Sequence, residues 1–364
     1  MSYKTATKLA QIGNRSDKQT GAVAAPIYLS TTYSHPELGE STGYDYTRTK
    51  NPTRDILEQA LAELESGSRG IVTSSGMSAI QLVFSFFPSG SEFLVSRDLY
   101  GGSYRYFEEL QKLAIATFHY FDDFESLIAQ LTPEITAVFL ETPTNPLMQE
   151  VSIKKVAQLT QAQETLLIVD NTFSTPLRQQ PLVLGADIVV HSGTKFLTGH
   201  NDILAGVVVA KDPEIGERLA WLANTTGPTL GSLDCWLFIR SLKTFKLRFE
   251  QQERNAQRIA KILNDQPQLK KVLYPGIGGM ISFYVKDAAK IKEFLAELKL
   301  ITFAESLGGV ESLITYPTTQ THADIPQELR ESYGLKPDLL RLSVGIEDSE
   351  DLANDLIRAL RVFD

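Results

Sequence analysis

Residues 166–195, LLIVDNTFSTPLRQQPLVLGADIVVHSGTK, contain two short apolar runs that are each followed at once by polar side chains. The first run, Leu166–Val169, ends in Asp170–Thr172, and the second, Asp187–Val190, ends in His191–Lys195. Continuous apolar runs of this length are typical of strands buried on both faces of a parallel sheet. Ligands of such sheets bind where the strands end. The stretch therefore predicts an α/β fold with a ligand site at these two polar segments.

The same alternation continues on both sides of this stretch. Further strands are expected at residues 70–73, 92–95, 137–140 and 206–210, and helices at residues 53–64, 78–87, 104–113 and 153–163. Strands that alternate with helices predict a mostly parallel sheet covered on both faces. After residue 230 a helical tract at 234–264 precedes strands at 280–285, 311–315 and 339–344 and helices at 288–298 and 348–362. This second pattern predicts a smaller α+β domain.

Three parts of the chain follow from this pattern. Residues 1–50 are polar, rich in Gly and Tyr and weakly periodic, so we expect an arm that packs on a neighbouring subunit. Residues 51–235 are expected to form the large domain that carries the site, and residues 236–364 the small C-terminal domain.

Composition excludes several classes of protein. The chain has 364 residues, with 44 acidic against 35 basic side chains and a formal net charge of −9, which argues against nucleic acid or an anionic membrane as partner. One cysteine, Cys235, rules out an internal disulfide framework, and no metal site is expected. No P-loop is present, and no apolar leader or membrane-spanning run is recognised. We therefore expect a cytoplasmic protein that acts on small molecules.

The polar groups at the strand ends match the needs of pyridoxal phosphate. A lysine forms a Schiff base with this cofactor, and a carboxylate keeps its pyridine nitrogen protonated; Lys195 and Asp170 are the candidates. Phosphate is bound by free N–H groups at a helix start and by small hydroxyls. The candidates for the phosphate contacts are Gly76, Met77, Ser192 and Thr194, and Tyr100 is the candidate for stacking on the ring.

Each of these residues alone has an ordinary explanation. Asp170 could cap a turn, Lys195 could be a solvated surface lysine, and residues 73–78 could be a helix start with nothing bound. A nicotinamide enzyme and a protein without catalytic activity are the alternatives to a pyridoxal phosphate enzyme. The pattern as a whole favours pyridoxal phosphate because each piece falls at a strand end of one sheet.

Motifs along nearly the whole chain resemble the cystathionine γ-synthase family, the transsulfuration enzymes of Cys/Met metabolism. The matching segments are YDYTRTKNPTR at 44–54, SGMSA at 75–79, DLYGGSYR at 98–105, ETPTNPL at 141–147, VDNT at 169–172, HSGTK at 191–195, AESLGGVES at 304–312 and LRLSVG at 340–345. The resemblance implies an aspartate-aminotransferase-like large domain (fold type I of pyridoxal phosphate enzymes). It also implies a homotetramer that is a dimer of dimers.

The resemblance also implies a role for each site residue. Lys195 carries the cofactor and then moves protons, with Tyr100 as a second acid and base. The other implied cofactor contacts are Asp170 at the pyridine nitrogen, Thr172 beside it, Gly76, Met77, Ser192 and Thr194 at the phosphate, and Tyr46 and Arg48 reaching the phosphate of the neighbouring subunit. The implied substrate contacts are Asn145, Arg105, Glu305, Ser306 and Arg341, with Arg341 on the α-carboxylate.

The reaction implied is γ-replacement on an O-acylhomoserine by cysteine or sulfide, which gives cystathionine or homocysteine in methionine biosynthesis. A cystathionine γ-lyase or β-lyase is the alternative, and Glu305 favours γ-chemistry. Thr49 and Lys50 stand where some synthases have a second arginine, so an acetyl ester is as plausible as a succinyl ester. The short tract at residues 272–280 is most similar to the bacillus-type subgroup with both γ-synthase and O-acetylhomoserine thiolyase activity.

Overall fold

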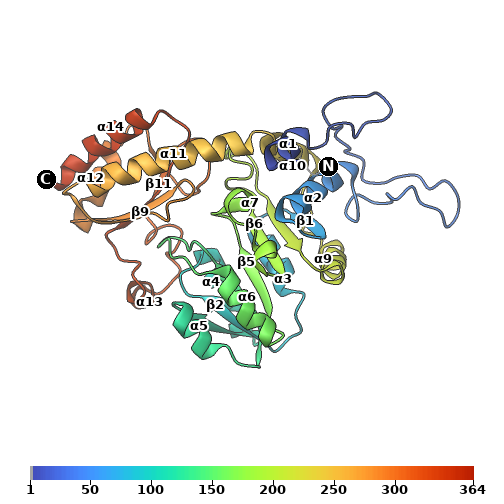
Figure 1. The fold of residues 1–364 in the computed structure, drawn as a ribbon, viewed down its shortest axis with the longest axis horizontal. Coiled ribbons are helices and arrows are strands. Elements are labelled where there is room, and N and C mark those ends of the chain that lie inside the picture. The colour runs from blue at the N-terminus through green and yellow to red at the C-terminus, as the bar shows by residue number, and fades with distance from the viewer. Residues whose placement is uncertain (1–2) are drawn as a thin grey trace.

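Two β-sheets with packed helices make up the part of the chain that the computed structural model describes, residues 3–364 (Figure 1). The larger sheet has seven strands in the order β1-β7-β6-β5-β4-β2-β3. Their bounds are β1 Arg69–Thr73, β2 Ser91–Ser96, β3 Ala116–Phe121, β4 Ile135–Glu141, β5 Leu166–Asp170, β6 Ile188–Ser192 and β7 Gly206–Ala210. Strands β3, β2, β4, β5 and β6 pair in parallel, and β7 pairs antiparallel with both β6 and β1. The predicted mostly parallel sheet is therefore confirmed.

Successive residues of the apolar strands enter two different cores. Val169 of β5 packs in one core and Ile168 in the other, because neighbouring side chains of a strand point to opposite faces. One face is covered by α2 (Pro52–Glu65), α5 (Phe124–Gln130) and α6 (Ile153–Ala162), and the other by α3 (Gly76–Phe84), α4 (Gly101–Lys112) and α9 (Pro213–Thr226). Both faces being covered explains why these strands are apolar throughout.

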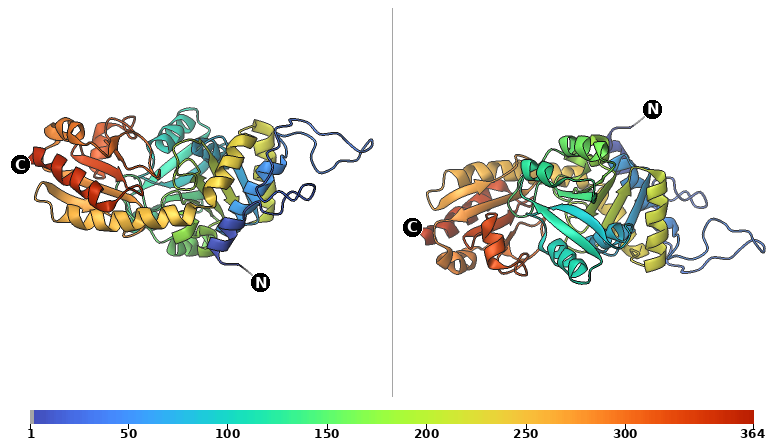
Figure 2. Two further views of the ribbon diagram at one scale, coloured as in Figure 1. Left: turned by 90° about the horizontal axis from the view of Figure 1, so that it is seen from above. Right: turned by 90° about the horizontal axis from the view of Figure 1, so that it is seen from below.

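The smaller sheet lies at the end of the molecule that holds the C-terminus (Figures 1 and 2). Its strand order is β10-β11-β12-β9-β8, with β8 Leu269–Leu273, β9 Met280–Val285, β10 Thr302–Phe303, β11 Leu313–Thr315 and β12 Leu339–Ser343. A separate apolar core joins this sheet to α11 (Phe245–Asn264), α12 (Ile291–Glu297) and α14 (Ser349–Leu360). We keep the division of the chain at residues 50 and 235 as a proposal.

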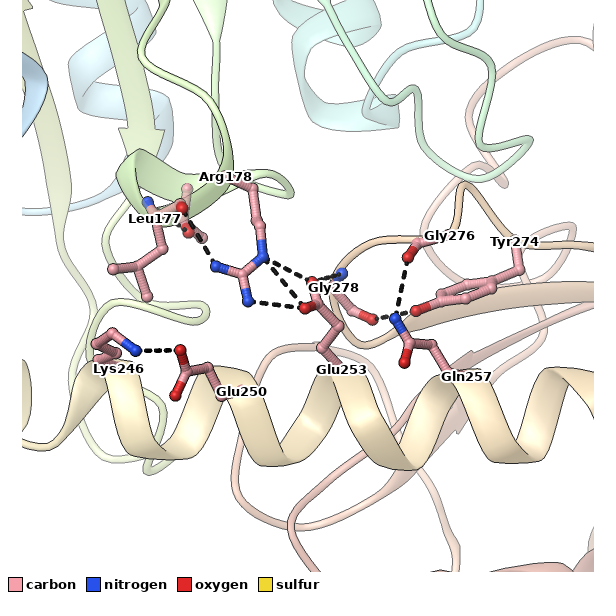
Figure 3. A network of polar contacts seen from close by, with 10 residues as sticks. Leu177, Arg178, Lys246, Glu250, Glu253, Gln257, Tyr274, Gly276 and Gly278 are labelled. Carbon is pink, nitrogen blue, oxygen red and sulfur yellow. Dashed lines mark hydrogen bonds and ion pairs between the residues drawn. The ribbon is translucent and has the colours of Figure 1, made fainter.

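A polar network ties the large sheet's helices to the small domain (Figure 3). The guanidinium of Arg178, on α7 (Thr175–Arg178), donates to Glu253 of α11, with Nη2 2.7 Å from Oε1. The same carboxylate accepts the N–H of Gly278 at 2.8 Å, and Gln257 donates to the carbonyl of Gly276. The glycines at residues 276–279 thus form a tied loop between β8 and β9.

The structure differs from the sequence expectations in several elements, including β8, α5 and α9, which were not expected. The predicted tract 234–264 is two helices, α10 (Ser232–Leu242) and α11, because the helix ends at Leu242 and a new one begins at Phe245. The expected arm begins with a short helix, α1 (Thr5–Gln11), that buries Leu9. Strand β3 was missed because its polar residues interrupt the apolar run.

Beyond α1 the arm runs as irregular chain to residue 50. Figures 1 and 2 show its loops projecting past α9, away from the small domain. Three aliphatic side chains on it are largely exposed: Leu38, Val23 at 75% and Leu29 at 72%. None of the helices in the described residues is long and apolar enough to cross a membrane.

Candidate active site

One cavity brings together most of the residues that the sequence singled out. It lies where β4, β5 and β6 end and where residues of the small domain face them. The predicted residues that line it are Gly76, Met77, Tyr100, Asn145, Asp170, Thr172, Ser192, Thr194, Lys195, Glu305, Ser306 and Arg341. Strands β5 and β6 are direct parallel neighbours, with Val169 opposite Val189, so their polar continuations share this edge as predicted.

Lys195 has a half-buried amine with a neutral partner. It follows β6 by three residues, and its Nζ donates to the Ser306 hydroxyl at 3.2 Å. Burial and the nearby Arg341 charge lower the pKa of Lys195 to about 8. The Glu305 charge acts in the opposite sense but is outweighed. The neutral fraction of this amine near physiological pH is therefore far larger than that of an ordinary lysine, which suits a nucleophile and a base.

The start of α3 forms a cradle for an anion. Ser75 caps the helix by accepting the N–H of Ser78, and the structure gives the N–H groups of Gly76 and Met77 no acceptor among residues 3–364. A Cβ on Gly76 would lie 2.9 Å from the Cβ of Ser192, so only glycine lets the helix start come this close to β6. Free N–H groups at a helix start bind phosphate.

The hydroxyl groups near the start of α3 differ in whether they already have hydrogen-bond partners. The hydroxyl of Thr194 exchanges hydrogen bonds with the backbone of Ala205, whereas the Ser192 hydroxyl has no partner among the described residues. The Thr172 hydroxyl accepts the N–H of Ser192 at 2.8 Å. Ser192 is therefore the hydroxyl best placed to contact a phosphate, and Thr194 holds the loop.

Asp170 ends β5 at the floor of the cavity. Its Oδ1 accepts the N–H of Thr172 at 2.9 Å. Burial raises the pKa of Asp170 above its usual range, although the Thr172 hydrogen bonds act in the opposite sense. A carboxylate that burial has stripped of water is stabilised by a neighbouring cation, and it stabilises that cation in return. A protonated ring nitrogen is such a cation.

Tyr100 stands at the start of α4 with its ring against Gly102. A Cβ on Gly102 would lie 2.5 Å from the ring, so this glycine makes room for the aromatic side chain. The N–H of Tyr100 donates to Glu141 Oε2 at 3.1 Å. Glu141, the last residue of β4, lines the same cavity, and the sequence did not point to it.

Arg341 of β12 is a buried cation held by neutral oxygens. It donates to Asn145 Oδ1 at 2.8 Å, to the Ser306 carbonyl at 3.1 Å and to the Thr315 hydroxyl at 3.1 Å. Its Nε has no partner in the described residues. A preorganised guanidinium with unused donor capacity fits a carboxylate.

A buried histidine supports this arginine indirectly. His322 Nε2 lies 3.0 Å from the carbonyl of Asn145, and its Nδ1 lies 2.8 Å from the Thr321 hydroxyl. Burial and the Arg341 charge lower the pKa of His322 to about 3, so the ring is neutral. In the structure this histidine fixes the backbone of Asn145.

Three predicted site residues lie outside the cavity. Arg105 pairs with Asp324 at the surface. Tyr46 and Arg48 lie on the arm, where Tyr46 is 48% exposed and Arg48 donates to Asn224. Their predicted roles are not tested by the cavity of a single chain.

The cavity fits pyridoxal phosphate at each of the cofactor's functional groups. The α3 cradle suits the phosphate, Asp170 the pyridine nitrogen and the Lys195 amine the aldehyde. Fold and site together define a pyridoxal-phosphate-dependent enzyme of fold type I.

The comparisons with known proteins give the family. The chain belongs to the family described as Cys/Met metabolism PLP-dependent enzyme, whose model matches residues 6–361. It is 56% identical to the Bacillus subtilis protein named cystathionine gamma-synthase/O-acetylhomoserine (thiol)-lyase, over 99% of this chain and 97% of that one. It is 45% identical to the cystathionine gamma-lyase of the same organism, over 98% of this chain and 99% of that one.

A solved structure agrees with this placement. The chain superposes with a TM-score of 0.98 and 39% identity on cystathionine gamma synthase from Xanthomonas oryzae pv. oryzae in complex with aminoacrylate and cysteine. The match covers 100% of this chain and 99% of that chain.

Proposed function

We propose that this enzyme catalyses γ-replacement on an O-acylhomoserine, with cysteine or sulfide as the incoming thiol, and forms cystathionine or homocysteine. The observation that carries the proposal is the 56% identity, over nearly the full length of both chains, to a protein named for both of these synthetic activities. Glu305 in the cavity beside Lys195 supports γ-chemistry.

The site residues have distinct tasks in this reaction. Bound pyridoxal phosphate supplies an electron sink that makes the α-hydrogen of the substrate acidic. Arg341 anchors the substrate α-carboxylate, which orients Cα and Cβ toward Lys195. The Lys195 amine, with its lowered pKa, removes protons from these carbons. Tyr100 lines the same cavity and serves as the second acid and base.

Product analysis tests the proposed direction. The cofactor-loaded protein is given O-acetyl- or O-succinylhomoserine with cysteine, and in parallel cystathionine alone. Net cystathionine from an ester, with slow cleavage of cystathionine alone, supports the proposal. Rapid cleavage with poor use of both esters establishes a lyase, the alternative that the 45% identical relative represents. Lys195→Ala is the control for background reaction.

We further propose that the preferred ester is acetyl. Arg105 is engaged by Asp324 instead of facing the cavity, and Thr49 and Lys50 provide no second arginine on the arm. A higher kcat/KM for the acetyl ester than for the succinyl ester is expected. Arg105→Ala then leaves acetyl turnover within about twofold of wild type, and a specific loss of succinyl turnover would assign Arg105 to that ester.

We also propose a cytoplasmic homotetramer, built as a dimer of dimers with shared active sites. The exposed apolar side chains of the arm support this assembly, and so does the position of Tyr46 and Arg48 outside their own chain's cavity. The single, buried cysteine, which has no internal partner for a disulfide, agrees with a reducing compartment.

Subunit mixing tests the shared site. A Lys195→Ala chain keeps its arm, and an Arg48→Ala chain keeps its lysine. If Arg48 acts on the neighbouring subunit, mixed dimers contain one intact site, and reassociated equimolar chains recover about one quarter of wild-type activity. Activity no higher than the mean of the two separate variants would show that Arg48 acts within its own chain.

A further inference from the structure

Two carboxylates end neighbouring strands at the floor of the cavity. Glu141 is the last residue of β4 and Asp170 the last residue of β5, and they are register partners in the parallel pair. Register partners of adjacent strands have Cα atoms about 5 Å apart and direct their side chains to the same face. Both side chains line the same cavity, and Glu141 is only 5% exposed.

No cation compensates this pair directly. Among residues 3–364 neither carboxylate takes part in an ion pair. A third carboxyl, Asp98, is buried near Glu141; burial raises the pKa of Asp98 to about 7, so it adds part of a negative charge there near neutral pH. Arg341 is the cation that faces Glu141, but its described hydrogen bonds go to Asn145, Ser306 and Thr315. Two adjacent carboxylates in a site of low polarity cannot both stay ionised.

Exposure and hydrogen bonds together decide which of the two keeps its charge. Asp170 is only half-buried and accepts the backbone N–H of Thr172 at 2.9 Å, and hydrogen bonding from Thr172 lowers its pKa against the effect of burial. Glu141 is more deeply buried; it accepts the backbone N–H of Tyr100 at 3.1 Å, and the Asn145 backbone acts on its pKa in the same lowering sense. Burial first, and then the Asp170 charge, raise the pKa of Glu141 well above its usual range. A pyridinium beside Asp170 favours the same distribution.

We propose that Glu141 is held as a neutral carboxylic acid beside an ionised Asp170 in the cofactor-loaded enzyme, and that it acts as a positioning residue for Tyr100. This inference rests on the proposed role of Asp170 at the pyridine nitrogen. A neutral Glu141 fixes the backbone of Tyr100 without competing with Asp170 for the cation. The negative charge of Asp170 is then the one available to the cofactor's pyridine nitrogen.

Infrared difference spectroscopy of the loaded enzyme tests the protonation state. Glu141→Gln removes the carboxyl and keeps its shape. The wild-type-minus-variant spectrum at pH 7.5 is expected to show a lost carboxylic acid carbonyl band that shifts in D2O. Glu109→Gln, at an exposed glutamate of α4 outside the cavity, is the control and should show lost carboxylate bands. Lost carboxylate bands in Glu141→Gln would overturn the proposal.

A pH titration of the cofactor's absorbance gives a second readout. Replacing a neutral acid by an amide should leave the pKa of the lysine-bound cofactor within about 0.3 pH unit of wild type. If Glu141 were ionised, losing its charge would lower that pKa by about one unit or more. Such a drop would contradict the proposal.

The positioning role is tested by comparing two substitutions. Glu141→Ala removes the acceptor of the Tyr100 N–H, so we expect the visible circular dichroism of the cofactor to weaken, whereas Glu141→Gln should restore it. Equal spectra for Ala and wild type would contradict the positioning role. Failure of this proposal and failure of the proposed function can be told apart. A wild-type chain that binds no pyridoxal phosphate would overturn the proposed function, whereas the Glu141 variants test only the protonation state and positioning role of Glu141.

Discussion

Lys195 combines one property that the sequence predicts with one that it does not. Its position three residues after β6 was predictable, because the apolar run ends at a defined residue. Its lowered pKa depends on burial and on Arg341, which lies 146 residues further along the chain and comes from the small domain. The chemistry of this amine is therefore a property of the folded chain.

The pH dependence of cofactor attachment follows from this pKa. With a pKa of about 8, the neutral fraction of the Lys195 amine rises about fivefold between pH 7 and pH 8 and levels off above pH 9. The rate of covalent attachment to cofactor-free protein, followed by absorbance, should rise and level in the same way. A rate that still climbs about tenfold per pH unit above pH 9, as for a free lysine analogue, would contradict the lowered pKa.

Glu141 shows where sequence reasoning stops at this scale. Asp170 and Lys195 were predictable because each follows an apolar run and lies close in sequence to the other. Glu141 also ends an apolar run, but its meaning depends on the register of β4 with β5, which brings it opposite Asp170. Register between strands is set by the whole sheet, so one sequence did not reveal this pair.

At the scale of elements, the start of α3 is positioned by close contact with β6. Gly76→Ala places a Cβ 2.9 Å from the Cβ of Ser192, so one of the two segments must shift. We expect at least a tenfold loss of cofactor affinity, measured by fluorescence titration. Gly231→Ala is the control, because its nearest neighbouring atom would lie 3.6 Å away, and it should bind like wild type. Unchanged affinity in Gly76→Ala would mean that the phosphate binds elsewhere.

The network in Figure 3 predicts a pH-dependent contribution to stability. Although burial opposes it, the bonds from Arg178 and Gly278 lower the pKa of Glu253. A carboxyl with a lowered pKa stabilises the folded state above its unfolded pKa of about 4.3, and that stabilisation is lost as the pH falls through the folded value. Arg178→Met should therefore lower the free energy of unfolding by about 1–2 kcal/mol at pH 7 and by less below pH 4.

Thermal unfolding of the variant against wild type measures this effect. The control is Arg254→Met, at an exposed arginine of α11 next to Glu253 that bonds only to Gln251 among the described residues. It should change the melting temperature by less than Arg178→Met at pH 7. If Arg178→Met lowered the stability equally at pH 7 and below pH 4, packing and not the ion pair would connect α7 to α11.

At the scale of the whole molecule, the sequence predicted both sheets and the smaller second domain. The sequence did not predict α1, because only seven weakly periodic residues form it, or the break at residues 243–244, where helical periodicity continues across two separate helices. The arrangement of the cavity between the two sheets also needed the fold. Arg341 and Ser306 reach Lys195 only because β12 and the loop before β11 face the end of β6.

The most direct test of the account is to locate the cofactor on the chain. The protein is loaded with pyridoxal phosphate, reduced with borohydride, digested and examined by mass spectrometry. The account predicts one modified peptide, with the reduced cofactor on Lys195, and loss of that label in Lys195→Ala. A label on another lysine, or no label on protein that is active with O-acetylhomoserine and cysteine, would contradict the assignment of the active site.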